Sequence, residues 1–409
     1  MSEPVRYLSA EDFDRPHPVH AVWELTLACD LKCNHCGSRA QKARPDELDT
    51  DEALDVVRQL AKLGCREVTL IGGEAYLRKD WTTIIAAIRA AGMKATLQSG
   101  ARNLTRARID QAVEAGLQAI GVSIDGLAEI HDEIRGVEGS FERAVEALAH
   151  CRDRGLDISV NTQIHSKILG DLPAMLDQFI ALGVKSWQIQ LTVAMGRAAD
   201  NDQVLIQPYQ LLEIMPLLFS LFEKGRAHGL LLIPGNNLGY FGPYEAHWRG
   251  GEDHAHFIGC NAGQNTLGIE ADGTIKGCPS LPTSVYAGGN VRDLDIEKIW
   301  NESPELAFTR NRTTADLWGH CHTCYYAEVC KAGCSWTTHT LLGRPGNNPY
   351  CHYRALQLDA RGLRERIVKV KQAPGLPFDY GGFELVEEPK DSPEQPLKKT
   401  GNARLPVLA

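Results

Sequence analysis

The chain has 409 residues, of which 43% are hydrophobic and 23% charged, with a formal net charge of -9. This composition predicts a soluble globular protein of one large or two to three smaller domains, and the negative charge argues against a nucleic-acid partner or an anionic membrane surface. The start lacks a signal-peptide pattern, and no stretch approaches the ~18 apolar residues of a membrane span. We therefore expect a cytoplasmic protein, in which clustered cysteines indicate metal or catalytic sites.

Short apolar runs alternate with amphipathic helical stretches from Ala21 to about Met195, after a polar N-terminal segment (1–20). The expected strands are Val22–Leu27, Glu67–Ile71, Lys94–Gln98, Ala119–Ile124, Asp157–Gln163 and Trp187–Thr192. Six strand–helix repeats predict a parallel sheet with helices outside, either an open doubly wound sheet or a barrel. Reactive residues then belong at the carboxyl ends of the strands.

The rest of the chain changes composition along its length. The barrel is expected over 21–232, with 203–232 helical and apolar, and a Gly- and Pro-rich linker over 233–255. Residues 256–355 hold seven cysteines and form a second domain. The segment 356–409 is expected to contain a C-terminal helix and, from about Gln372, a tail rich in prolines and charges, the last part of which is expected to be poorly ordered.

Cys29, Cys33 and Cys36 follow the first expected strand directly. Three thiolates this close can converge on a soft metal centre. A structural zinc site would need a fourth ligand, whereas a [4Fe–4S] cluster held by three cysteines keeps one iron open. Three packed core cysteines are the alternative, but the polar residues between them disfavour it.

This cysteine run resembles the signature of the radical S-adenosylmethionine (AdoMet) superfamily. In that family the three cysteines bind the cluster, and AdoMet chelates the open iron through its amino and carboxylate groups. His35 stands where the family usually carries an aromatic residue near the adenine. Gly72-Gly73-Glu74, at the end of the second strand, matches the segment that contacts the AdoMet amino group, with Ala75 in place of the usual proline. From the residues alone, two interpretations of the paired glycines stay open. They either let the backbone approach a ligand closely or form a plain strand-to-helix turn.

Further polar residues lie toward the ends of later strands. Ser123 and Asp125 should share a face of the fourth strand, and together with Arg135 they resemble an AdoMet-contacting segment of peptide-modifying members. Helix capping is the alternative for Ser123, and the roles of Asp125 and Arg135 stay open. Asn161 and Gln163 on the fifth strand, like Gln188 and Gln190 on the sixth, are either ligand-binding groups or satisfied core amides.

A second cysteine group runs from Cys260 to Cys351. Two zinc sites would need an eighth ligand, which His320, His322 or His352 could supply, and iron–sulfur clusters suit the same thiolates. The series resembles the SPASM extension of radical AdoMet enzymes, which carries two auxiliary [4Fe–4S] clusters. That resemblance assigns an outer cluster to Cys321, Cys324, Cys330 and Cys351, and an inner cluster to Cys260, Cys278 and Cys334. No cysteine follows Cys260 closely, so we expect the inner cluster to be open to substrate or to take a non-cysteine ligand.

Together these resemblances imply an α/β protein, a partial (β/α)6 TIM-like barrel followed by a small cysteine-rich SPASM domain. They imply an enzyme that forms a 5′-deoxyadenosyl radical, which abstracts a substrate hydrogen. Because most SPASM members modify peptides, the first expectation is a maturase of a ribosomally synthesised peptide, making a crosslink, thioether, epimerised or oxidised residue. Its partners would be the peptide, a flavodoxin- or ferredoxin-type reductant and, for leader recognition, a separate protein.

Other functions stay open at this point. They are a radical AdoMet enzyme acting on a protein or small molecule, a non-enzymatic iron–sulfur electron carrier, and a zinc-stabilised binding module. A sulfatase maturase is disfavoured because Pro279, rather than an Asp general base, follows Cys278. Cys65 and Cys151 lie outside both groups and are expected to be packing residues.

Overall fold

A curved sheet of ten strands organises the molecule, in the order β10-β9-β8-β1-β2-β3-β4-β5-β6-β7. This computed structural model describes residues 8, 12, 15–249 and 256–393. Strands β1 to β7 pair in parallel, each with the next along the chain. They span His20–Glu24, Glu67–Ile71, Lys94–Ser99, Ala119–Ser123, Asp157–Ile164, Ser186–Leu191 and Leu231–Pro234. The expected parallel α/β sheet is confirmed.

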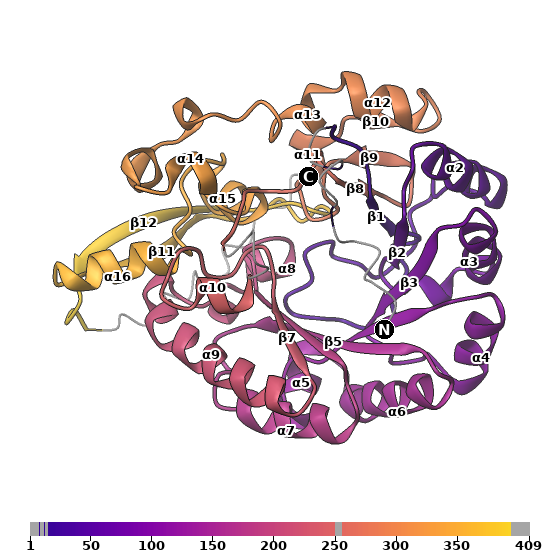
Figure 1. The fold of residues 1–409 in the computed structure, drawn as a ribbon, viewed down its shortest axis with the longest axis horizontal. Coiled ribbons are helices and arrows are strands. Elements are labelled where there is room, and N and C mark those ends of the chain that lie inside the picture. Colours follow the sequence, from indigo (N-terminus) through magenta and orange to yellow (C-terminus); the bar gives the residue numbers. More distant parts are fainter. Residues whose placement is uncertain (1–7, 9–11, 13–14, 250–255, 394–409) are drawn as a thin grey trace, which may run out of the picture.

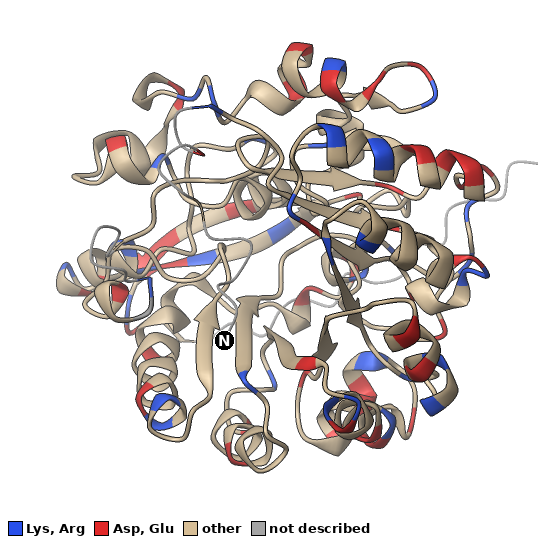
Figure 2. Ribbon diagram, turned by 45° about the vertical axis from the view of Figure 1, so that its right-hand side comes forward, with Lys and Arg blue, Asp and Glu red and all other residues tan. Residues whose placement is uncertain are grey.

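Helices cover the outer face of this sheet (Figure 1). The principal ones are α2 (Thr50–Lys62), α3 (Trp81–Ala90), α4 (Arg106–Glu114), α5 (Ala128–Arg135), α6 (Ser140–Asp153), α7 (Leu172–Ala181) and α9 (Leu211–Ala227). Short helical turns follow several strands: η1 (Ala75–Leu77), α8 (Arg197–Asp200), η2 (Asp202–Val204), η3 (Pro208–Gln210) and α10 (Glu245–Trp248). In Figure 2 acidic and basic positions intersperse along these outer helices, while the central strands carry few charges.

Side-chain alternation along the strands separates the core from the barrel interior. In β5, Ile158, Val160, Thr162 and Ile164 are buried, whereas Ser159, Asn161 and Gln163 between them are only half-buried. The same alternation runs through β6. Because successive side chains in a strand point to opposite faces, the apolar set packs under the helices and the polar set faces the interior.

The barrel has a seventh parallel strand that the sequence did not predict. Residues 203–232 were expected to be helical, but α9 ends at Ala227 and β7 follows and pairs with β6. The break is Gly229, whose φ of 76° suits glycine. β7 was missed because its short apolar run continues the composition of the helix before it, and four residues carry too little periodicity to distinguish the two.

The expectation that no stretch could span a membrane also needs correction. The helical stretch Asp202–Ala227 is long and apolar enough by length and composition alone, and half of its apolar window is buried inside the fold. Its α9 portion packs on β7, α7 and α16. This stretch therefore forms part of the barrel wall in the described structure.

The cysteine-rich region is joined to the barrel through the sheet. Strand β8 (Thr266–Ile269) pairs in parallel with β1, and β9 (Thr274–Lys276) and β10 (Gly289–Asn290) extend the sheet antiparallel from it. The remaining elements are short: α11 (Thr283–Tyr286), α12 (Ile296–Glu302), α13 (Pro304–Ala307), η4 (Thr314–Asp316), η5 (Gly319–Thr323), α14 (Ala327–Cys330), α15 (Ser335–Leu342) and α16 (His352–Ala360). The seam between β1 and β8 places this region beside the barrel mouth (Figure 1).

The stretch from Gln372, whose last part was expected to be poorly ordered, is structured as far as residue 393. β11 (Leu363–Lys371) and β12 (Gly382–Pro389) form an antiparallel hairpin that buries Ile367 and Phe383. Between them, Asp379 lies 2.7 Å from Arg39. Composition did not predict this order, because the burial of a few side chains outweighs the effect of many exposed charges. Residues 394–409 lie outside the described residues.

Candidate active site and metal centres

The loop that carries Cys29, Cys33 and Cys36 lies at the carboxyl end of β1 and is fixed by backbone hydrogen bonds. Within it, the backbone N–H groups of Lys32 and Asn34 donate to the carbonyls of Arg135 (3.1 Å) and Ile134 (2.8 Å) at the end of α5. From the other side, the Arg197 guanidinium donates to the Cys33 carbonyl at 2.7 Å. The three sulfur atoms are close enough to oppose one another's ionisation, so they can serve one metal centre.

Asp125 and Arg135, whose roles the sequence left open, and His35, expected near the adenine of AdoMet, meet next to this loop. Asp125 is fully buried; its Oδ2 lies 2.6 Å from Arg135 Nη2 and 3.1 Å from His35 Nε2, and its Oδ1 accepts from the Gln163 backbone at 2.8 Å. Burial opposes ionisation, but Arg135 and His35 hold the pKa of Asp125 well below its usual range. Arg135 also donates to Cys33 Sγ at 3.7 Å. The structure therefore gives Asp125 and Arg135 a positioning role, while His35 Nδ1 has no partner in the described chain.

Gly72 and Gly73 allow the backbone that follows β2 to approach the backbone that follows β1 closely. A Cβ on Gly72 would lie 2.4 Å from the Thr26 carbonyl, and one on Gly73 would lie 2.0 Å from the Ala28 carbonyl. Glu74 is buried and accepts from Ser99 Oγ at 2.5 Å and the Gly100 backbone at 2.7 Å. Burial raises its pKa to about 8, and it lies next to Cys29 and Asp30. A carboxyl group so placed can receive an ammonium beside the cysteine loop.

Neutral polar side chains line the barrel interior above β3 to β6. Ser123 on β4 is in register with Asn161 on β5, which is in register with Gln188 on β6; Gln163 and Gln190 form the next pair. Asn161 also hydrogen-bonds Gln98 of β3. These half-buried groups offer amide donors and acceptors to a bound molecule.

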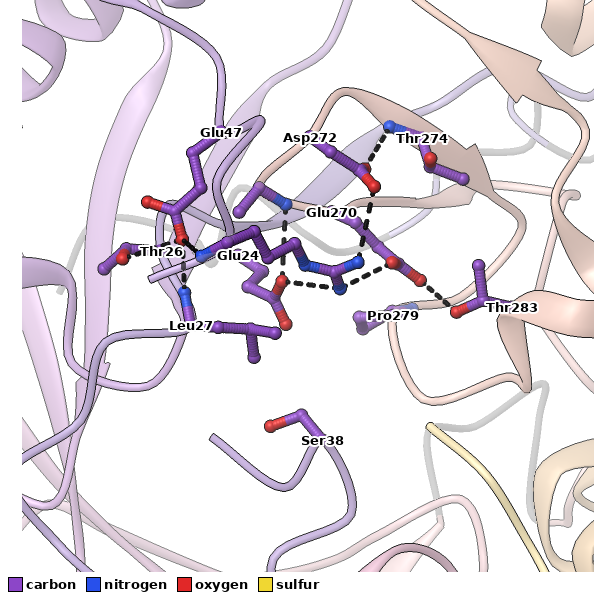
Figure 3. A network of polar contacts seen from close by, with 12 residues as sticks. Glu24, Thr26, Leu27, Ser38, Glu47, Glu270, Asp272, Thr274, Pro279 and Thr283 are labelled. Carbon is purple, nitrogen blue, oxygen red and sulfur yellow. Dashed lines mark hydrogen bonds and ion pairs between the residues drawn. The ribbon is translucent and has the colours of Figure 1, made fainter. Parts of the chain in front are cut away.

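A buried network of charges lies at the seam between β1 and β8 (Figure 3). The guanidinium of Arg44 lies 3.2 Å from Glu24 and 2.7 Å from Glu270, and 3.3 Å from Asp272. Lys276, fully buried, lies 2.6 Å from Glu270. Burial raises the pKa of Glu24 to about 7, although Arg44 acts in the opposite direction. This network locks the cysteine-rich region onto the first barrel strand.

The seven later cysteines gather in two sets. Cys321, Cys324, Cys330 and Cys351 line one small cavity together with aromatic side chains, among them Tyr240 and Tyr326. Cys260, Cys278 and Cys334 form the second set: Cys260 opposes the ionisation of Cys278, and Cys260 and Cys278 both oppose that of Cys334. The division matches the outer and inner sets that the resemblance assigned.

Tyr240 connects the two sets. Its carbonyl accepts from Cys351 Sγ at 3.8 Å, and its hydroxyl accepts from the Cys334 backbone at 3.1 Å. The residue is buried and has a φ of 96°, which is strained for a non-glycine residue. It belongs to the segment 233–255, which was predicted as a linker. A lone tyrosine among glycines gave no sequence signal of this role.

The thiol environments fit iron–sulfur clusters. Burial raises the pKa of Cys33 to about 11 and that of Cys334 to about 12, so these thiols would stay protonated without a metal. Metal binding displaces such protons, and thiolate-rich sites select soft metals. The cysteine loop after β1 and the inner set each offer three thiols, which suits a [4Fe–4S] cluster with one iron open to another ligand. The outer set offers four thiols, which suits a cluster whose irons are all held by cysteine.

Comparisons with known proteins identify the same two regions. Residues 23–191 match the model of the Radical SAM superfamily, and residues 260–325 match SPASM, an iron–sulfur cluster-binding domain. The chain is 29% identical to an AdoMet-dependent heme synthase of Methanosarcina barkeri over 82% of its length and 97% of that protein. It is 27% identical to a PqqA peptide cyclase of Ruegeria pomeroyi, covering 84% of this chain and 89% of the other.

A solved structure with a similar fold is that of Streptococcus suis SuiB bound to S-adenosylmethionine. The two share 16% identity over 83% of this chain and 77% of SuiB, with a TM-score of 0.64. At this identity the likeness concerns the fold. The two domain matches, the related enzymes and the cysteine sets together make [4Fe–4S] clusters and AdoMet the cofactors of this chain.

Proposed function

Because the chain belongs to the radical SAM superfamily and carries a SPASM domain, we propose that it is a maturase of a ribosomally made peptide. The observation that carries this proposal is the gathering of ten cysteines into three sets, one in the loop that follows β1 and two in the cysteine-rich region. Cys29, Cys33 and Cys36 would hold the AdoMet-binding cluster. When bound, this cluster and AdoMet supply a 5′-deoxyadenosyl radical that removes a substrate hydrogen atom.

The chain's own residues would bind and orient the two ligands. Glu74, beside Cys29, would accept from the AdoMet ammonium, and His35 Nδ1 and Ser123 would contact its nucleoside. Asp125 and Arg135 would hold the cysteine loop in position. The four outer cysteines and the three inner cysteines would hold the auxiliary clusters, and these would supply electron exchange with the substrate or with a flavodoxin- or ferredoxin-type donor.

The barrel interior favours a peptide as the substrate. The residues that face it toward the carboxyl ends of β3 to β6 are Gln98, Ser123, Asn161, Gln163, Gln188 and Gln190, which pair well with backbone amides. A substrate bearing several carboxylates would be recognised instead by arginine or lysine. The related heme synthases make a tetrapyrrole the rival substrate class.

The first test is anaerobic incubation of the reconstituted protein with AdoMet and dithionite, assayed for 5′-deoxyadenosine. Cys33→Ala should abolish the product, whereas Cys151→Ala, a buried position on α6 outside all three sets, should retain it. The peptide encoded by any short open reading frame beside the gene is then added, and a change in its mass is sought. Turnover of a tetrapyrrole, with the peptide unchanged, would overturn the peptide assignment.

A further inference from the structure

Arg312, in the loop that follows α13, is a buried cation without a carboxylate partner in the described chain. Arg312 is 7% exposed to solvent. One guanidinium nitrogen, Nη1, donates to Ser335 Oγ at 2.9 Å, while Nη2 is buried with no hydrogen-bond partner among the described residues. The guanidinium carbon lies 5.2 Å from the centroid of the Phe308 ring.

Such an arrangement is costly unless something nearby carries negative charge. A guanidinium stays protonated in proteins, and an isolated charge removed from water is strongly disfavoured unless it is paired. A hydroxyl and an aromatic face do not neutralise it. The missing negative charge must therefore come from a group that the amino-acid side chains around Arg312 do not supply.

The two other buried arginines beside cysteine sets are paired. Arg135, next to Cys33, lies 2.6 Å from Asp125. Arg354, which influences Cys321 of the outer set, lies 2.5 Å from Glu365. Each of these guanidinium charges is balanced by a carboxylate, so each cluster nearby sees a nearly neutral pair. Arg312 differs from both.

Arg312 lies against the inner cysteine set. Its hydrogen-bond acceptor, Ser335, directly follows Cys334. Its aromatic neighbour, Phe308, packs in the same apolar cluster as Cys260 and Cys278. The guanidinium thus bonds the residue next to Cys334 and contacts an aromatic ring of the apolar cluster against which Cys260 and Cys278 pack.

We propose that Arg312 is the counter-charge of the inner auxiliary cluster and sets its reduction potential; this rests on the proposed function, which places a cluster on Cys260, Cys278 and Cys334. Three thiolates give a [4Fe–4S]2+ core one net negative charge, which one guanidinium balances. One-electron reduction adds a second negative charge, and a fixed cation nearby favours the reduced form, because net charge and hydrogen bonding set cluster potentials. The inner cluster is therefore easier to reduce than the outer one, whose arginine is neutralised by Glu365.

The test is a redox titration of the auxiliary clusters by EPR. It uses the full chain carrying Cys29→Ala, Cys33→Ala and Cys36→Ala, so that only auxiliary clusters remain. Arg312→Met removes the charge and keeps much of the side-chain volume. Arg312→Lys keeps the charge, and Arg344→Met removes an exposed arginine of the same region, stacked on Trp318. Iron and sulfide are measured for each variant.

Arg312→Met should move the midpoint of one of the two auxiliary signals to lower potential. For a charge several ångströms away at an effective dielectric near 20, the shift is at least about tenfold in the reduced-to-oxidised ratio, or about 59 mV for one electron. Arg312→Lys should keep most of the parent value and Arg344→Met all of it. Unchanged midpoints in Arg312→Met, with both clusters present, would overturn the inference.

Failure of the underlying assignment gives a different result. Suppose that the chain without its first three cysteines binds iron for one auxiliary cluster only. If replacing Cys260 and Cys278 by Ala then leaves that iron content unchanged, no cluster occupies the inner set. The cluster assignment of the proposed function would then be wrong. If Arg312→Met fails to fold, the midpoint of Arg312→Lys against that of Arg312→Gln carries the same comparison.

Discussion

Replacing Glu24 by glutamine should stabilise this protein at alkaline pH. Glu24 is 2% exposed and accepts hydrogen bonds from Arg44 and from the Ala271 backbone, both through Oε1. A glutamine oxygen can accept both. Arg44 would keep Glu270 and Asp272 as carboxylate partners, so removing the charge of Glu24 leaves two carboxylates for the two cations, Arg44 and Lys276.

The magnitude follows from the pKa of Glu24. Burial raises it from 4.5 to about 7, so between these values the folded state binds more protons than the unfolded state. Stability therefore falls as pH rises through this window, and the full cost is in place above pH 7. The raised pKa of Glu24 lowers the free energy of unfolding by about 1 kcal/mol at pH 5 and by about 3 kcal/mol at pH 8. Because Glu24→Gln has no such titration, its free energy of unfolding should rise relative to that of the parent by about 2 to 3 kcal/mol between pH 5 and pH 8.

The assay compares thermal midpoints of the reconstituted parent and Glu24→Gln at pH 5 and pH 8. With an unfolding entropy of about 2.1 cal/mol/K per residue, the gain corresponds to about 3 °C at pH 8 relative to pH 5. An equal difference between parent and variant at both pH values would refute the reasoning. A variant less stable at pH 8 than at pH 5, relative to the parent, would show that the ion pair with Arg44 outweighs the cost of burial.

Three further perturbations test the cysteine surroundings. Gly73→Ala places a Cβ 2.0 Å from the carbonyl that precedes the cysteine loop and should cost about 1–3 kcal/mol and lower the iron content, whereas Gly170→Ala meets nothing within 4 Å and should change neither. Asp125→Asn leaves a buried guanidinium without its carboxylate, which should cost about 3–5 kcal/mol. Because the pKa of Asp125 is lowered in the fold, the parent should lose this stabilisation below about pH 4 and the variant should not; parallel acid-unfolding curves would contradict this. Glu365→Gln frees Arg354 from its partner and should raise the potential of the outer cluster, and a midpoint that stays or falls would count against charge balance.

The sequence by itself determined the chemistry and the repeating architecture. Cys29-x3-Cys33-x2-Cys36 and the spacing of the later cysteines predicted soft-metal sites from the residues. Their resemblance to the radical AdoMet and SPASM signatures implied iron–sulfur clusters. The strand–helix period predicted the parallel sheet because alternation and helical periodicity are local properties. The close approach of Gly72 and Gly73 to the Thr26 and Ala28 carbonyls was not visible in the sequence, because it depends on the packing of β1 beside β2.

Only the tertiary structure decided what depends on residues far apart in the chain. β7 was not predicted, because its four residues form a strand through pairing with β6 rather than through a pattern in their own sequence. The β11–β12 hairpin gains its order from a few buried contacts that composition does not report. The pairing of Asp125 with Arg135, of Arg354 with Glu365, and the absence of such a carboxylate for Arg312 in the described chain depend on which side chains the fold brings together. Charge balance around each cluster is a property of three-dimensional neighbours, so no pattern along the sequence could reveal it.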